Sequence, residues 1–435
     1  MKRIIQSKLI DWKDSSRRKP LIIKGARQVG KTWLAEQLGR DHFKTFVKAD
    51  LEKQPDLHRL FKGNIAPKRI IEDLEFFSGT RIIPGETLLF IDEIQACPRA
   101  LTALRYFFED VPGLHIIAAG SLLEFALGEI SVPVGRVQYV RVYPMNFFEF
   151  LCALGKDIQA DYLARDHSEV SEVIQDSLLK DLRTYFFVGG MPEAVNVYRD
   201  TKSLLEVFSV QSEIIESYRD DFGKYAPRAD KTCLDAVLTG VARLIGEQIQ
   251  YTSLDRNHSI PTVHKAFDLL NRAEVIYKIQ SVNPSGIPLK GSVNSKRFKA
   301  AVLDIGIMQR LCRVPADAEL TNDDLAEMYR GKLAEQFVTQ EFAAAHNSEV
   351  YYWSREKRGS SAEVDFLAVR EGKIYPVEVK SGRQGRLRSL HLLLEKYPDC
   401  PEGLVLYSGV YAKRPEQKLI FLPLYCAGSL HTMPL

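Results

Sequence analysis

Short apolar runs alternate with helical stretches along the first third of the chain. The runs lie at residues 21–23, 45–49, 87–91, 115–119 and 138–142, and each has the length and apolar character of a strand buried in a sheet. A helical pattern, at residues 33–38, follows the first of them. This alternation predicts an α/β domain over residues 1–145, with a parallel sheet and with ligands at the carboxyl ends of its strands.

Helical patterns dominate the middle of the chain. Residues 146–228 have amphipathic periodicity, interrupted by a Gly-Gly-Met-Pro break at residues 189–192, and predict a helical lid and connector. Three further helical patterns, at residues 233–245, from Leu254 and from Pro261, precede two strand-like segments joined by a Pro-Ser-Gly turn. Three helices followed by a β-hairpin predict a winged helix over residues 229–315.

The last segment returns to mixed α/β patterning. Residues 331–338 are helical, and residues 351–353, 363–367 and 374–380 are strand-like. The last two strands alternate apolar and polar positions, which places acidic side chains on one face of a sheet. We therefore expect a further α/β domain over residues 316–435.

The composition fits several packed domains in one chain. Of 435 residues, 45% are hydrophobic and 26% are charged, as in ordinary globular proteins, and the net charge of +3 neither requires nor excludes a polyanionic partner. Six cysteines lie singly, without a CxxC pair, which suits a reducing compartment. No apolar leader follows the charged N-terminus, and no stretch approaches the roughly 20 apolar residues of a membrane span. We expect a cytoplasmic protein without a membrane segment.

A glycine-rich loop joins the first predicted strand to the first helix. It has the pattern GxxxxGK(S/T), and its residues are Gly25, Ala26, Arg27, Gln28, Val29, Gly30, Lys31 and Thr32. Glycines let the backbone curl so that successive N–H groups face phosphates, and the helix N-terminus adds partial positive charge. We expect Lys31 to reach the β- and γ-phosphates of ATP and Thr32 to bind Mg²⁺. An accidental glycine turn is the alternative, and the flanking strand and helix argue against it.

The apolar strand at residues 87–91 ends in two carboxylates, Asp92 and Glu93. Asp92 is expected to hold Mg²⁺ through its water shell, and Glu93 to orient and deprotonate the water that attacks the γ-phosphate. In the alternative interpretation the two acids only begin a loop or cap a helix.

Two further polar residues end apolar strands. Ser121 follows the strand at residues 115–119 and lies beside the γ-phosphate if that strand neighbours the one ending at Asp92. It is a candidate phosphate sensor, although serine after glycine is also ordinary in a turn. Asp50 has the simpler interpretation of an N-cap.

These residues resemble the AAA-type P-loop ATPases, and more closely the bacterial and archaeal ATPases that carry a C-terminal domain of unknown function. The resemblance rests on GARQVGKT at 25–32, LLFIDEIQ at 88–95, AAGSLLE at 118–124, VGRV at 134–137, VYPMNFFEF at 142–150 and GGMPEAV at 189–195. It implies ATP and Mg²⁺ as cofactors and supports Ser121 as a sensor. Arg136 is the candidate for an arginine that touches nucleotide in its own or in a neighbouring subunit, with a surface arginine as the alternative. The sequence shows no obvious second sensor arginine in the lid, so it neither predicts nor excludes a particular homo-oligomer.

In the predicted winged helix, the third helix is the element that would enter a DNA major groove. Thr262, His264 and Lys265 are expected on its exposed face, while the hairpin, whose return segment ends in Lys296-Arg297-Phe298-Lys299, lies on phosphates. The helix is not strongly basic, and a winged helix used only for protein contacts is the alternative.

The last domain carries Glu335 on a helix, then Asp365, then Glu378 and Lys380 on one strand. This constellation resembles the PD-(D/E)xK nucleases of restriction-endonuclease type. By that resemblance, Asp365 and Glu378 bind a second divalent metal, Mg²⁺ or Mn²⁺, and Glu335 assists directly or through water. Lys380 would position the attacking water and stabilise the charge on the scissile phosphate.

Basic residues surround this motif. Residues 351–388 hold nine Lys or Arg against five Asp or Glu, and those expected to follow a phosphodiester backbone are Arg355, Lys357, Arg358, Arg383, Arg386 and Arg388. An alternating strand also shows charges on its solvated face without any site. Many such nucleases have proline at the position of Val364. This departure weakens the expectation of DNA cleavage more than the expectation of the fold.

Two functions are consistent with these patterns. In the first, an ATP-driven enzyme acts on DNA, and nucleotide state controls access to a metal-dependent nuclease site. In the second, a nucleotide-switched ATPase regulates or binds a protein partner through a nuclease-like domain that does not cleave. A remodelling ATPase that acts on proteins is less well supported, because the sequence shows no clear aromatic pore motif.

Overall fold

The computed structural model describes the chain except residues 1, 122, 127–134, 166, 168–169, 226–228, 315–326, 348, 358–359, 381–386 and 431–435. The described residues fall into two compact units, Lys2–Tyr143 and Pro144–Leu435. Each unit is described by itself.

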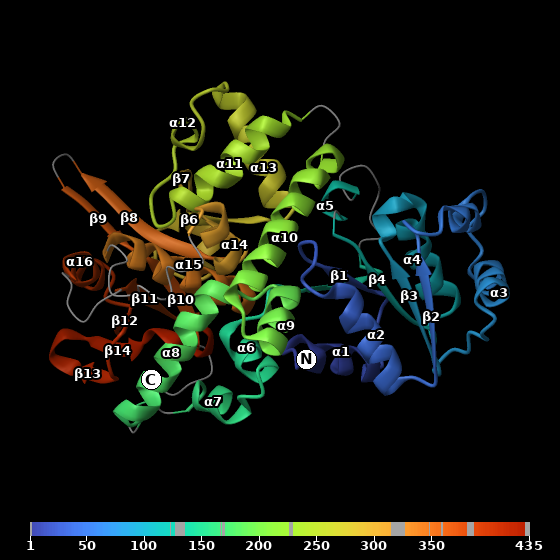
Figure 1. Cartoon of the computed structure of the whole chain (residues 1–435), viewed down its shortest axis with the longest axis horizontal. Coiled ribbons are helices and arrows are strands. Elements are labelled where there is room, and N and C mark those ends of the chain that lie inside the picture. Colours follow the sequence, from blue (N-terminus) through green and yellow to red (C-terminus); the bar gives the residue numbers. More distant parts are fainter. Residues whose placement is uncertain are drawn as a thin grey trace. The chain divides into compact units, whose positions relative to one another are not determined.

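The N-terminal unit is built on a five-stranded parallel sheet in the order β2-β3-β4-β1-β5 (Figure 1). Its strands are β1 (Leu21–Lys24), β2 (Thr45–Asp50), β3 (Thr87–Asp92), β4 (His115–Ala119) and β5 (Gln138–Arg141). These are the five apolar runs of the sequence, so the predicted α/β class and parallel sheet are confirmed. Because all strands run the same way, their carboxyl ends share one edge of the sheet.

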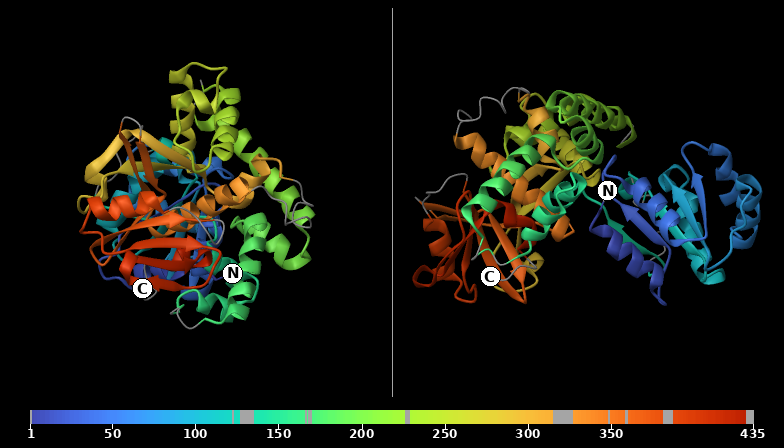
Figure 2. Two further views of the ribbon diagram at one scale, coloured as in Figure 1. Left: turned by 90° about the vertical axis from the view of Figure 1, so that its left-hand side faces the viewer. Right: turned by 60° about the horizontal axis from the view of Figure 1, so that its bottom comes forward.

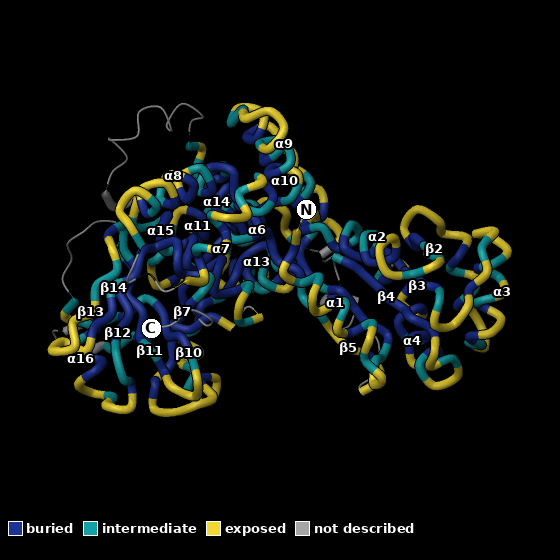
Figure 3. Tube along the Cα trace, turned by 90° about the horizontal axis from the view of Figure 1, so that it is seen from below, coloured by how far each residue is buried: buried dark blue, intermediate teal, exposed yellow. Residues whose placement is uncertain are grey.

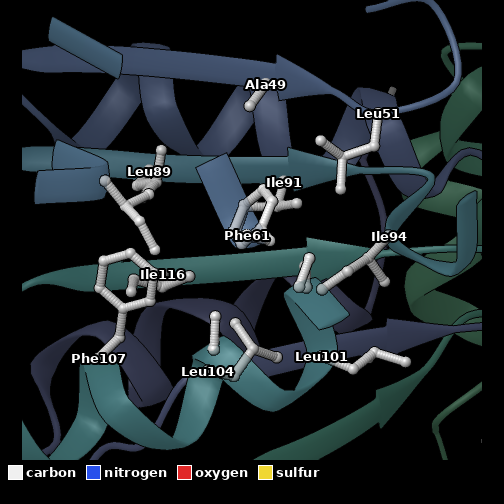
Figure 4. Packing of buried hydrophobic residues seen from close by; sticks show 14 of the residues in the cluster. Ala49, Leu51, Phe61, Leu89, Ile91, Ile94, Leu101, Leu104, Phe107 and Ile116 are labelled. Atoms are coloured by element: carbon white, nitrogen blue, oxygen red, sulfur yellow. The ribbon is translucent and has the colours of Figure 1, made fainter. Parts of the chain in front are cut away.

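Helices pack against this sheet because its central strands β3, β4 and β1 are apolar on both faces. They are α1 (Ile5–Asp14), α2 (Lys31–His42), α3 (Pro67–Ser78), α4 (Pro98–Asp110) and the short α5 (Leu123–Ala126). All six residues of β3 are buried, and Figure 3 shows β3 and β4 as buried while α3 has long exposed stretches. In Figure 4, Leu89 and Ile91 of β3, Ile116 of β4, and Leu104 and Phe107 of α4 belong to one cluster of buried side chains. This packing fixes the positions of the central strands and of their carboxyl ends.

The second unit begins with helices, as the amphipathic pattern predicts. They are α6 (Phe147–Ala153), α7 (Asp157–Tyr162), α8 (Glu172–Val188), α9 (Pro192–Thr201) and α10 (Leu204–Tyr225), followed by α11 (Lys231–Arg243), α12 (Tyr251–Leu254), α13 (Ile260–Arg272) and α14 (Ile305–Leu311). Between α8 and α9 the backbone packs closely against Met145. A Cβ on Gly190 would lie 1.9 Å from the carbonyl oxygen of Met145, so this position requires glycine.

Two sheets complete this unit. One has the order β7-β6-β8-β9, from β6 (Ile276–Val282), β7 (Val293–Val302), β8 (Tyr351–Lys357) and β9 (Ser360–Val364). The other has the order β10-β11-β12-β14-β13, from β10 (Phe366–Arg370), β11 (Lys373–Val379), β12 (Gly403–Tyr407), β13 (Ala412–Arg414) and β14 (Leu419–Pro423). Helices α15 (Glu327–Ala345) and α16 (Arg388–Lys396) accompany them. Figure 2 shows these orange and red strands from two further sides.

The predicted winged-helix hairpin is not a free wing in this arrangement. Strands β6 and β7 pair antiparallel, as expected for a hairpin, but β6 also pairs in parallel with β8, in the register Gln280 to Tyr351. One sheet therefore extends across the predicted boundary at residue 316, and a separate winged-helix domain stays a prediction.

A buried acid, Glu341 on α15, fixes the start of α6. Its Oε1 accepts a hydrogen bond of 2.9 Å from the backbone N–H of Phe147. Burial raises the pKa of Glu341 to about 8, although the hydrogen bond from Phe147 opposes the shift. The folded state therefore retains this proton at pH values where the unfolded chain has lost it.

This raised pKa predicts that Glu341 weakens the fold as the pH rises. Between its ordinary pKa of about 4.5 and its folded pKa of about 8, the folded state binds the extra proton, so the unfolding free energy falls with increasing pH. Glu341→Gln, which removes the titration, should gain about 1 to 3 kcal/mol over the unsubstituted protein between pH 5 and pH 8. Urea denaturation followed by circular dichroism measures the difference. Glu416→Gln, at an exposed position, is the control, and a difference for Glu341→Gln that does not change with pH would contradict the assignment.

Candidate functional site

The glycine loop between β1 and α2 has the curled backbone that phosphate binding requires. Gln28 and Gly30 have φ angles of 65° and 94°, both left-handed. Gly25 has φ 147°, and a Cβ there would lie 2.3 Å from the carbonyl oxygen of Val142. Glycine is therefore required at position 25 both by the backbone conformation and by the space. The remaining loop residues, Ala26, Arg27 and Val29, complete the turn before α2.

Lys31 is the first residue of α2, and its side chain turns back over the loop. Its Nζ donates hydrogen bonds to the carbonyl oxygens of Gly25 and Ala26, at 3.0 and 2.6 Å. Only 7% of the residue is exposed. The ammonium thus lies within the loop whose N–H groups are expected to surround phosphates.

Thr32 and Asp92 meet although they are sixty positions apart in sequence. The Thr32 hydroxyl donates to Asp92 Oδ2 at 3.0 Å. Hydroxyl and carboxylate oxygens are hard donors of the kind that Mg²⁺ prefers, so these two residues fit the predicted magnesium ion. The contact joins the glycine loop to the carboxyl end of β3.

Lys48 is a further member of this site that the sequence did not indicate. It lies on β2, next to β3, and its Nζ is 3.1 Å from Asp92 Oδ2 and 3.0 Å from Glu36 Oε1. Partial burial lowers the pKa of Lys48, but the hydrogen bonds to Glu36 and Asp92 outweigh that effect and raise it. Lys48 therefore partly neutralises Asp92.

Glu93 follows Asp92 in a left-handed conformation, with φ 46°. Its carboxylate accepts a hydrogen bond from the side-chain amide of Gln95. Gln95 in turn lies against the end of β4, where a Cβ on Gly120 would be 1.9 Å from Gln95 Oε1. Gln95, which no sequence pattern marks as a site residue, thus orients the predicted catalytic base.

Ser121 was expected beside the γ-phosphate if its strand neighbours the one that ends at Asp92, and β4 and β3 are neighbours. Strand β4 lies between β3 and β1, so Ser121, two residues beyond β4, follows the strand that separates the glycine loop from Asp92. Its role as a sensor stays a prediction. Asp50 accepts backbone N–H groups of Glu52 and Lys53, at 3.2 and 3.0 Å, and caps the turn after β2.

Arg136 lies at the opposite edge of the sheet. It precedes β5, which is parallel to β1, and is therefore at the amino-terminal edge, whereas the glycine loop follows the carboxyl end of β1. Its Nε is 3.0 Å from Glu109 Oε1. The prediction of a nucleotide contact within its own subunit is thus wrong for this arrangement, because the sheet separates the two, and only the contact with a neighbouring subunit stays a prediction.

The structure brings together the four residues of the nuclease-like motif in the second unit. Glu335 comes from α15, Asp365 is the single residue between β9 and β10, and Glu378 and Lys380 come from the end of β11. Asp365 Oδ2 accepts the backbone N–H of Val379 at 2.9 Å, and Lys380 Nζ donates to Glu378 Oε1 at 2.7 Å. Asp365 therefore lies where the two sheets adjoin.

A fifth residue, Lys299 of β7, enters this acidic cluster. Its Nζ lies 2.6 Å from Glu363 Oε1, 3.4 Å from Glu335 Oε2 and 3.7 Å from Asp365 Oδ1. Only 2% of the Lys299 side chain is exposed. The prediction that this end of the hairpin lies on phosphates is therefore wrong for Lys299, which is buried between acids.

Two acids of the cluster, Glu335 and Glu378, hold protons more tightly than usual. Burial, together with the nearby Asp365 carboxylate, raises the pKa of Glu335 to about 7 and that of Glu378 to about 8. Burial opposes the charge of Lys299, but Glu335, Asp365 and Glu363 outweigh it and raise the Lys299 pKa. Within the described residues, Glu378 Oε2 is buried and has no hydrogen-bond partner. Carboxylates with an unsatisfied buried oxygen fit a divalent cation.

The predicted DNA-contacting residues are only partly described. On α13, His264 and Lys265 are exposed and Thr262 is half-buried. Of the basic residues near the nuclease-like motif, Arg355 is half-buried and Arg388 is exposed. Arg358, Arg383 and Arg386, and the side chain of Lys357, lie outside the described residues.

Among the helices that the structure describes, none has the length and apolar character needed to cross a membrane.

Three segments of the chain match known protein families. Residues 17–151 match an AAA domain, residues 179–318 a domain of unknown function (DUF8612), and residues 330–427 a domain of unknown function (DUF4143). An uncharacterised protein of Haemophilus influenzae is 26% identical over 231 residues, which is 50% of this chain and 50% of that protein. The chain thus spans about half the length of this curated relative.

Solved structures are similar at low identity. The Walker-type ATPase PABY2304 of Pyrococcus abyssi has a TM-score of 0.44 at 15% identity, over 72% of this chain and 96% of its own. The RuvB Holliday junction branch migration motor of Thermotoga maritima has a TM-score of 0.30 at 12% identity, over 62% of this chain and 87% of its own. Drosophila ORC bound to DNA has a TM-score of 0.27 at 12% identity, over 74% and 95%.

The AAA domain match covers both the glycine loop after β1 and the carboxylates after β3. The N-terminal part of the chain is therefore an AAA-type P-loop ATPase domain, and two domains of unknown function follow it.

Proposed function

We propose that the chain binds and hydrolyses ATP in a Mg²⁺-dependent reaction at the carboxyl edge of the N-terminal sheet. The hydrogen bond of 3.0 Å between Thr32 and Asp92 carries this proposal, since it joins the two predicted magnesium ligands beside the Lys31 ammonium. Lys31 and the loop N–H groups bind the β- and γ-phosphates, and bound Mg²⁺ neutralises charge that develops between them. Glu93, held by Gln95, orients and deprotonates the attacking water.

Two other residues complete this proposed site. Ser121 senses the γ-phosphate from the strand next to Asp92. Arg136 reaches the nucleotide of a neighbouring subunit, which makes the active form a homo-oligomer. Its pairing with Glu109 is exposed, so exchanging that partner for a phosphate costs little.

The function that the second unit supports best is an ATPase that acts on DNA. The assembled Glu335, Asp365, Glu378 and Lys380, with Lys265 and Arg388 exposed elsewhere on the unit, favour a nucleic-acid partner. In this role Asp365 and Glu378 hold a divalent ion that polarises the scissile phosphate, and Lys380 positions the attacking water. The second candidate is an ATPase whose nuclease-like domain binds a protein partner and does not cleave, which the extra Lys299 in the cluster favours.

One assay separates these functions. The full chain is incubated with single- and double-stranded DNA, with and without ATP and Mg²⁺ or Mn²⁺, and both phosphate release and DNA cleavage are measured. We expect phosphate release that requires the metal, and DNA cleavage that Asp365→Ala abolishes without reducing phosphate release. Cleavage that is absent in every condition, with phosphate release intact, excludes the nuclease and leaves the partner-binding ATPase. Phosphate release that persists in EDTA would contradict the proposed ATPase chemistry.

A further inference from the structure

Lys299 is buried inside the acidic cluster, whereas lysine side chains usually extend into solvent. Three elements surround its ammonium with carboxylates, namely Glu335 of α15, Glu363 of β9 and Asp365 between β9 and β10, all within 3.7 Å. A buried lysine without such partners would be strongly disfavoured, and the carboxylates would repel one another without the lysine. The ammonium and the acids therefore stabilise each other.

The cluster divides into two halves, each with its own lysine. Lys299 lies closest to Glu363 and Glu335, whereas Lys380 Nζ donates to Glu378 Oε1 at 2.7 Å. Asp365 lies between the halves, since its Oδ1 faces Lys299 at 3.7 Å while its Oδ2 accepts the N–H of Val379 on the Glu378 strand. The two halves do not offer a metal ion the same surroundings.

Among the described residues of the cluster, the buried carboxylate oxygen without a hydrogen-bond partner lies in the Glu378 half. Glu378 Oε2 is buried and without a hydrogen-bond partner within the part of the chain that the structure describes. Counted with full charges, the four carboxylates of Glu335, Glu363, Asp365 and Glu378 exceed the ammonium groups of Lys299 and Lys380 by two negative charges. A single divalent cation balances that excess, and a second would leave the buried cluster positively charged.

We propose that Lys299 is the built-in cation of the Glu335–Glu363 half, so that the cluster takes one divalent metal ion, at Asp365 and Glu378. Glu335 is then a partner of Lys299 and not a ligand of the metal, and Lys299 is a positioning residue contributed by the β6–β7 hairpin. This inference rests on the nuclease-like part of the proposed function and is independent of the ATPase site.

Binding of Mn²⁺ to the nucleotide-free full chain, measured by electron paramagnetic resonance, tests the proposal. We expect one Mn²⁺ that Asp365→Asn and Glu378→Gln each abolish. Glu335→Gln should weaken that Mn²⁺ by no more than about tenfold, the lower end of the effects seen for residues that only support metal ligands. If Glu335→Gln abolishes the Mn²⁺ as completely as Glu378→Gln does, Glu335 is a ligand and the proposal is overturned.

Substitutions of Lys299 itself provide a second readout. Lys299→Met frees Glu335 and Glu363 and should allow a second Mn²⁺ to bind, whereas Lys299→Arg, which keeps the charge, should retain one. Lys296→Met removes an exposed lysine from the same strand and is the matched control. A folded Lys299→Met variant with one Mn²⁺ of unchanged affinity would overturn the proposal, as would two Asp365-dependent ions in the unsubstituted chain.

Two further outcomes are distinguishable. If Lys299→Met does not fold by circular dichroism, the comparison of Glu335→Gln with Glu378→Gln decides the question alone. If the unsubstituted chain binds no Asp365-dependent Mn²⁺, the inference fails, and phosphate release from ATP by the same sample shows whether the ATPase proposal fails with it.

Discussion

Replacing Lys31 with alanine is expected to abolish ATP binding, the largest effect of any single substitution in this chain. The substitution removes a buried ammonium that lies over the glycine loop, and with it the positive charge for the β- and γ-phosphates. Charge-assisted hydrogen bonds of this type contribute about 1.5 to 3 kcal/mol each, so the loss of two or more weakens binding by at least about 100-fold. Isothermal titration calorimetry with ATP and Mg²⁺ measures the loss.

Lys44→Ala is the matched control for this substitution. Lys44 lies in the same unit, is 73% exposed and pairs with Glu86 at the surface. Its loss should leave ATP affinity unchanged. Equal affinities of the Lys31→Ala variant and the unsubstituted protein would show that the nucleotide binds elsewhere.

The second large effect is expected for Glu93→Gln, which should retain ATP binding and lose turnover. Glutamine keeps the shape of the side chain and can still accept the hydrogen bond from Gln95, but it cannot take a proton from water. A general base contributes roughly 10²- to 10⁴-fold, so kcat should fall by about that factor. Steady-state phosphate release and ATP binding are measured on the same preparation.

An exposed acid of the same unit is the control for Glu93→Gln. Glu86→Gln removes a surface carboxylate that is 41% exposed and should hydrolyse ATP at the unsubstituted rate. Normal turnover in Glu93→Gln would assign the base to another residue.

Most residues of the proposed ATPase site could be selected from the sequence because they lie in two short local patterns. The glycine loop and the strand that ends at Asp92 each contain their own chemical signal, and the apolar runs around them correctly predicted the strands of the sheet. Lys48 was not predictable, because it reaches Asp92 only through the neighbouring positions of β2 and β3. The sequence does not give strand order. The edge of the sheet at which Arg136 lies was not predictable for the same reason, since it follows only from the direction of β5.

The acidic cluster was predictable in its local parts. Glu378 and Lys380 lie two positions apart at the end of β11, so the period of two places them on one face, and Asp365 precedes β10, which pairs with β11. Lys299 lies on β7, which reaches the cluster only because β6 pairs with β8 across the predicted domain boundary. Sequence patterning suggested an exposed hairpin, and the pairing of distant strands instead buried its last lysine.

The central claim is that the glycine loop, Lys31 and the Thr32–Asp92 pair form a site for ATP with Mg²⁺. Calorimetric titration of the unsubstituted full chain with ATP, in Mg²⁺ and again in EDTA, tests it most directly. The account predicts one ATP bound per chain, with an affinity that falls when the cation is removed. Absence of any adenine-nucleotide binding in the presence of Mg²⁺ would contradict it.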